Sequence, residues 1–126
     1  MIIIKSKMEI EAMREAGRVV AQAHQIVADN LRPGITSMEL DQMVEEFILS
    51  QNAIPAFKGY QGYPASICAS INEVVVHGIP NQVPLEEGWI VSVDIGAFVD
   101  GFCGDSAWTY SVGNIEPEIL KLLEVT

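Results

Sequence analysis

The dipeptide Asp100-Gly101 constrains the fold of this chain more than any other feature of its sequence. It separates two segments rich in β-branched and aromatic residues, 89–97 and 102–111, and such residues favour strands. A two-residue type I′ turn requires positive φ at both central positions, and Asp-Gly is a preferred pair for that turn. The sequence therefore predicts an antiparallel hairpin in which Val99 pairs with Phe102 and every other pair follows from that one.

The register of this hairpin brings two aspartates together. Asp94 should face Ala107 and Asp105 should face Gly96, so the aspartates become diagonal neighbours on one face of the sheet, with Cα atoms about 7 Å apart. Two ionised carboxylates directed at one point repel each other, which raises the pKa of one of them or recruits a cation. From the residues alone, two interpretations stay open: a divalent metal site, or two aspartates on a solvated sheet face.

Three helices are expected around the hairpin. Ser-x-x-Glu at 6–9 and Thr-x-x-Glu at 36–39 have the spacing of capping boxes, in which hydroxyl and carboxylate each satisfy a free backbone donor at a helix start. The predicted helices span 6–31 and 36–51, and a third begins near Pro117. The side chains expected to be buried in the first two helices are Ile10, Met13, Val20, Ala23, Val27, Leu40, Val44, Phe47 and Ile48.

Two further strands are predicted between the helices and the hairpin, at Ser66–Ser70 and Val74–His77. The region 53–64 contains prolines and glycines that break helices, together with aromatic residues, and is expected to be an aromatic-rich loop. All four strands should form one antiparallel sheet. The expected class is α+β, a single domain over residues 1–126 with two N-terminal helices packed on the sheet.

The charge and the cysteines exclude some classes of function. Seven basic and seventeen acidic residues give a net charge of −10, which repels nucleic acid and anionic membrane surfaces, so neither is an expected partner. Cys68 and Cys103 lack CxxC spacing, and reduced thiols are expected. No apolar stretch has the length needed to span a membrane. A cytoplasmic protein is expected.

Three segments of the sequence resemble one enzyme family. They are SINEVVVHGIP at Ser70–Pro80, VDIG at Val93–Gly96 followed by DGFCGDSA at 100–107, and KGYQGYP at 58–64 with SIC at 66–68. Their order and spacing resemble the type I methionine aminopeptidases over essentially the whole chain. The resemblance implies that the chain is the N-terminal lobe of the pita-bread fold that creatinase and these aminopeptidases share.

The resemblance also implies roles for individual residues. Asp94 corresponds to a ligand of one metal ion and Asp105 to a carboxylate that bridges two. His77 corresponds to a catalytic residue that would hydrogen-bond the scissile amide. The pocket for the methionine side chain would be lined by Tyr60, Tyr63 and Cys68, with Phe57 and Trp108 as neighbours. His24 matches no such position and is expected to be an ordinary helix residue.

The activity that the resemblance implies is removal of the N-terminal methionine from nascent proteins and peptides, through hydrolysis by a metal-bridging hydroxide. Two divalent ions of cobalt, manganese, iron or zinc would be the cofactors. One histidine and two glutamates that complete the ligand set in the family, and a further catalytic histidine, match no position here.

Two alternatives stay open. One is another pita-bread peptidase with Xaa-Pro specificity. The other is a non-catalytic isolated lobe of 126 residues. That lobe would be inactive alone, would bind metal weakly and would pair into a homodimer through uncovered apolar surface.

Overall fold

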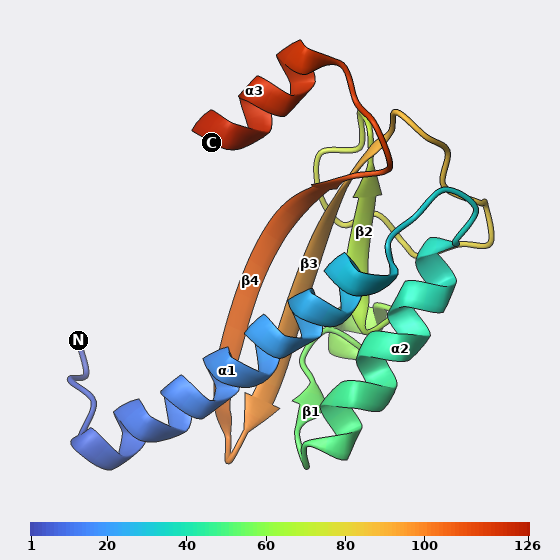
Figure 1. The fold of residues 1–126 in the computed structure, drawn as a ribbon. Helices are drawn as coiled ribbons and strands as arrows, with labels where there is room; N and C mark the ends of the chain where they lie inside the picture. The colour runs from blue at the N-terminus through green and yellow to red at the C-terminus, as the bar shows by residue number, and fades with distance from the viewer.

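A computed structural model describes all 126 residues and shows two helices lying on one face of an antiparallel sheet. The helices are α1 (Lys7–Asn30) and α2 (Ser37–Ser50), which pack against each other and the sheet, whereas α3 (Pro117–Val125) stands apart beyond the end of β4 (Figure 1). The strands are β1 (Ile54–Pro55), β2 (Ile67–Ile71), β3 (Ile90–Val99) and β4 (Phe102–Ser111). The predicted α+β class is confirmed.

Both predicted capping boxes are present. The amide N–H of Ser6 donates to Glu9 at 2.7 Å, and that of Thr36 donates to Glu39 at 2.8 Å, while each hydroxyl accepts from the amide of its glutamate. The α3 helix begins at Pro117 as expected, because proline needs no amide partner in the first turn. The helix boundaries therefore follow from local sequence chemistry.

The hairpin of β3 and β4 has the predicted register. Val99 pairs with Phe102, Asp94 with Ala107 and Gly96 with Asp105. Asp100 and Gly101 form the turn with φ of +48° and +80°. The alternate residues of β3 that face the helices are fully buried, namely Val91, Val93, Ile95 and Ala97. Asp94 therefore lies on the opposite face, away from the hydrophobic core.

The strand β3 is the centre of the sheet. β4 pairs along its whole length, so β2 and the short β1 share its other edge. β1 lies inside the segment that was expected to be a loop. The sequence does not predict this strand, because two residues are too few to show any alternation of apolar and polar side chains. Its pairing sets the start of the aromatic-rich loop beside β3, where the amide of Ala56 donates to the carbonyl of Gly96 at 2.9 Å.

The predicted strand Val74–His77 is wrong. The chain turns at Asn72, where φ is +51°, and the three valines that follow are exposed. His77 has φ of +59°, which is incompatible with a strand. A run of β-branched residues favours a strand only where a neighbouring edge is available, and here the turn carries the run into an irregular loop.

The predicted buried stripe of α1 is only partly correct. Val20, Ala23 and Val27 are buried, but Ile10 and Met13 are 44% and 41% exposed. The reason is visible in Figure 1, where the N-terminal turns of α1 extend beyond the sheet. Packing begins at Ala16, where α1 crosses Gly104 of β4 so closely that a Cβ on Gly104 would lie 2.6 Å from the Ala16 carbonyl carbon. In α2, Leu40, Val44 and Ile48 are buried and Phe47 is partly buried.

Candidate metal-binding site

One pocket collects nearly all the residues expected to act in catalysis or binding. It has a volume of about 540 Å³ and lies between the face of the sheet that the helices leave uncovered and the aromatic-rich loop. Seven of the eight expected side chains line it: Phe57, Tyr60, Tyr63, Cys68, His77, Asp94 and Asp105. The remaining lining residues are Gln61, Gly62, Pro64 and Ile79.

The two aspartates converge in this pocket. Burial and the neighbouring carboxyl of Asp105 raise the pKa of Asp94 to about 6, and the nearby His77 opposes the rise. The Oδ1 atom of Asp94 is buried without a hydrogen-bond partner, which is rare for a buried acceptor. A carboxylate pair with an unpaired buried oxygen suits a divalent cation, which accepts such oxygens as ligands and relieves their repulsion.

Few side chains in the pocket could serve as metal ligands. No group of three or more histidine, cysteine, aspartate or glutamate side chains is arranged to hold a metal ion. A protein metal site generally uses three or four protein ligands when it binds zinc, and more oxygen ligands when it binds larger ions. Asp94 and Asp105 would therefore supply two carboxylates to a metal site that needs further ligands.

His77 reaches the pocket from an irregular segment that is held at the edge of β2. The next residue, Gly78, accepts from the amide of Ala69 at 2.8 Å, and its own amide donates to Ser70 Oγ at 3.1 Å. The Tyr63 hydroxyl also lies 3.1 Å from the Gly78 carbonyl oxygen. The imidazole is exposed, so it is available to a ligand in the pocket.

The aromatic wall of the pocket is anchored on one side and exposed on the other. The Tyr63 hydroxyl donates to the Ile67 carbonyl at 2.9 Å, and burial raises the pKa of Tyr63 above its usual range. Phe57 packs over Gly96, where a Cβ would lie 2.7 Å from the phenyl ring. Tyr60 is 67% exposed at the rim. Cys68 is buried and pairs in register with Asp94, and burial raises the pKa of its thiol.

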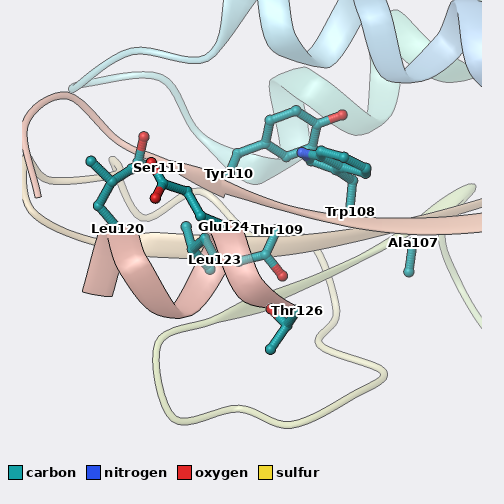
Figure 2. A pocket seen from close by; sticks show the side chains of 9 residues that line it. All are labelled: Ala107, Trp108, Thr109, Tyr110, Ser111, Leu120, Leu123, Glu124 and Thr126. Carbon is teal, nitrogen blue, oxygen red and sulfur yellow. The ribbon is translucent and has the colours of Figure 1, made fainter. Parts of the chain in front are cut away.

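Trp108 does not join this pocket. It pairs with Val93, whose side chain faces the helices, so Trp108 lies on the opposite face from Asp94. Figure 2 shows Trp108 and Tyr110 on one side of β4, with Ala107, Thr109 and α3 on the other. Trp108 instead lines two other hollows, one with α3 and one with His24. The placement of Trp108 beside the methionine pocket is therefore corrected.

Four lining residues, including Gly62, had no role predicted from the sequence. Gln61 and Pro64 belong to the loop segment and Ile79 to the SINEVVVHGIP segment, so the resemblance marked their neighbourhoods without assigning roles. Gln61 has φ of +48° inside the short helical turn Tyr60–Gly62. No local pattern in the sequence predicts a left-handed glutamine, because its conformation depends on the loop that surrounds it.

The raised pKa of Asp94 predicts a pH-dependent stability of the metal-free protein. The pKa of Asp94 is about 6 in the folded state and about 3.9 in the unfolded state. Between these two pH values the folded state binds more protons than the unfolded state. The free energy of unfolding therefore falls as the pH rises to about 6. Solvent screening limits the loss to about 1 kcal/mol. Urea unfolding of wild type and Asp94→Asn at pH 4 and pH 7 measures it. A pH-independent difference between the two proteins would contradict the raised pKa.

Comparison with known proteins identifies the class of protein to which this fold belongs. Residues 11–126 match the sequence profile of metallopeptidase family M24. The chain belongs to metallopeptidase family M24. None of its helices is both long and apolar enough to cross a membrane.

Within this family, the chain is similar in sequence to methionine aminopeptidases. Methionine aminopeptidase 1 of Bacillus subtilis is 56% identical over 126 residues, and the Clostridium acetobutylicum enzyme is 51% identical over 127 residues. The chain spans about half the length of the curated relatives it matches, 51% in both cases.

Solved structures give the same result for the fold. The chain superposes on methionine aminopeptidase from Rickettsia prowazekii with a TM-score of 0.97 at 41% identity, covering all of this chain and 51% of that one. Prolidase from Pyrococcus furiosus has a TM-score of 0.84 at 24% identity, covering 98% of this chain and 35% of that one, which shows a shared fold alone. The predicted pita-bread fold is confirmed.

Proposed function

We propose that the polypeptide containing these residues is a methionine aminopeptidase that removes the N-terminal methionine from nascent proteins and peptides. The observation that carries the proposal is the convergence of Asp94 and Asp105 in one pocket with the aromatic wall formed by Tyr60 and Tyr63. Carboxylates supply metal ligands, and aromatic rings with a thiol suit the flexible thioether of methionine. Xaa-Pro specificity is less well supported, because three solved proline-specific enzymes with a similar fold share less than 25% sequence identity with this chain.

The chemistry divides among the pocket residues. Asp94 and Asp105 would hold two divalent ions, of cobalt, manganese, iron or zinc, with the remaining ligands coming from outside these residues. Such ions, when bound, supply an activated water and stabilise the developing oxyanion. His77 would hydrogen-bond the scissile amide, a suitable role for an exposed imidazole at the pocket. Tyr60, Tyr63, Cys68 and Phe57 would surround the methionine side chain.

A cleavage assay on the natural polypeptide tests this function. We expect release of methionine from Met-Ala-Ser to depend on added divalent metal, and an Xaa-Pro-Ser peptide to be cleaved far more slowly. Preferential cleavage of the Xaa-Pro peptide would replace the proposal with the prolidase-like alternative. The cytoplasm is the proposed location because nascent chains emerge there. For these 126 residues in isolation, a homodimer is the expected state, which light scattering would test.

Tyr63→Ala is expected to lower kcat/KM for methionine-initiated peptides by about 10- to 200-fold, because it removes apolar pocket wall worth about 1–3 kcal/mol. Metal content should be unchanged, since Tyr63 supplies no ligand. Steady-state kinetics with Met-Ala-Ser, together with metal analysis, measures both effects.

The matched control is Tyr63→Phe, which keeps the ring and loses only the hydroxyl that anchors to Ile67 and Gly78. We expect it to lose less activity than Tyr63→Ala, because the ring that forms the pocket wall remains. An unchanged kcat/KM in Tyr63→Ala would remove Tyr63 from the substrate pocket.

A further inference from the structure

The helix α2 presents a buried carboxylate to the start of β2, at Ile67 and the preceding residue Ser66. Asp41 is 8% exposed, and its Oδ1 atom accepts from the amides of Ser66 at 2.8 Å and Ile67 at 2.9 Å. Both amide-bearing residues are fully buried. Burial raises the pKa of Asp41, and the two amide donors oppose the rise. Hydrogen bonds to an ionised acceptor are stronger than neutral ones, so this contact fixes where β2 begins.

The residues held by Asp41 lead directly to the wall of the pocket. The carbonyl of Ile67 accepts the Tyr63 hydroxyl at 2.9 Å, and Cys68 follows Ile67 in the chain. A shift of the Ser66–Ile67 peptide would therefore displace the Tyr63 ring and the Cys68 thiol together. The aspartates of the metal site are held differently, because Asp94 and Asp105 lie on the hairpin of β3 and β4.

A second contact joins α2 to the aromatic-rich loop that precedes β2, and it is weaker than the contact of Asp41. Lys58 donates to Glu45, one turn along α2 from Asp41, at 2.7 Å. The Lys58 side chain is 48% exposed and that of Glu45 is 24% exposed. Exposed ion pairs contribute little because water screens them. Of the two contacts, only the buried one leaves unsatisfied donors when it is removed.

We propose that Asp41 is a positioning residue for substrate specificity: through the Ser66 and Ile67 amides it holds the pocket wall formed by Tyr63 and Cys68 at the distance that fits a methionine side chain. This role rests on the proposed function. Asp41 does not touch the pocket, since it is absent from the residues that line it. It acts through the backbone of β2.

The test compares four variants of the natural polypeptide loaded with divalent metal. Asp41→Ala removes the acceptor and leaves two buried N–H groups without partners, so KM for Met-Ala-Ser should rise at least about tenfold. Asp41→Asn keeps a carbonyl oxygen that accepts from both amides, and KM should stay within about threefold. Glu45→Gln, the matched control on the same helix, should leave KM within about twofold. Metal affinity measured by calorimetry should be unchanged throughout.

The fourth variant covers the case in which Asp41→Ala does not fold. Asp41→Glu keeps the charge and the acceptor but is longer by one methylene, so it pushes the Ser66–Ile67 peptide and should also raise KM several-fold.

Three results would overturn the inference: a lowered kcat with unchanged KM in Asp41→Ala, as a smaller folded fraction would give; an unchanged KM in Asp41→Glu; or a loss of metal affinity in Asp41→Ala. Wild-type protein that fails to cleave Met-Ala-Ser would overturn the proposed function instead, so the two failures are distinguishable.

Discussion

Asp105→Asn is expected to abolish tight divalent metal binding and to lower kcat/KM for methionine-initiated peptides at least about 100-fold in the natural polypeptide. Loss of a group that merely supports a metal ligand already costs about 10- to 100-fold, and loss of the ligand itself should cost more. Asp94→Asn should have a smaller effect on metal binding, because a bridging carboxylate neutralises two cations and a terminal one serves a single ion. Calorimetric titration with divalent metal measures the difference.

The matched control for this comparison is Asp100→Asn. It makes the same change of charge five residues away, in the exposed turn of the same hairpin. Asparagine is favoured at this position of a type I′ turn, so the hairpin should tolerate it. Asp100→Asn should leave metal affinity and kcat/KM near the wild-type values. Equal loss of both metal ions in Asp94→Asn and Asp105→Asn would show that the terminal and bridging roles are wrongly assigned.

Gly104→Val is expected to lower the free energy of unfolding by about 3 kcal/mol or more, the upper part of the usual cost of overpacking. A Cβ at this position would lie 2.6 Å from the carbonyl carbon and 2.7 Å from the carbonyl oxygen of Ala16. These are backbone atoms, so α1 has to move away from β4 as a unit. Chemical denaturation of the metal-free protein measures the loss.

Gly17 provides the control for this prediction, because it belongs to the same crossing of α1 over β4. A Cβ on Gly17 would meet no atom within 4 Å. Gly17→Ala should therefore stabilise the protein by about 0.5–1 kcal/mol, since alanine is the better helix former. If Gly104→Val and Gly17→Ala shifted stability in the same direction and by similar amounts, close packing would not be the reason for glycine at position 104.

The sequence predicted those parts of the fold that depend on short-range chemistry. The turn at Asp100-Gly101 fixed the whole register of β3 and β4, including the diagonal arrangement of Asp94 and Asp105. The capping boxes located the starts of α1 and α2. In each case a few neighbouring residues determine the backbone conformation, and tertiary packing does not alter it.

The errors occurred where tertiary contacts decide. The run Val74–His77 has strand-forming residues, but the positive φ angles at Asn72 and His77 keep it out of an extended conformation, and the chain returns to the edge of β2 only at Gly78. Trp108 was placed beside the pocket by resemblance, although it is an odd number of residues from Asp105 and the alternation of strand faces already excludes it.

Asp41 illustrates a different limit. An aspartate on an amphipathic helix is expected to face water, because buried carboxylates are rare. Its partners, the Ser66 and Ile67 amides, lie 25 and 26 residues away. Backbone donors leave no signal in the side-chain pattern of a sequence. The role of Asp41 therefore became visible only in the folded chain.

The glycines beside the two aspartates have a consequence for protein engineering. Gly96 has no side chain because Phe57 packs on it from the pocket face, and Gly104 has none because the backbone of α1 crosses it on the other face. If the hairpin with these aspartates were grafted into a foreign sheet, it would keep the spacing of the two carboxylates. It would lack both Phe57, which covers Gly96, and α1, which covers Gly104. Such a graft would expose two bare glycines and weaken its own strands. Transfer of this hairpin to a new scaffold therefore requires the helix and the aromatic loop as well.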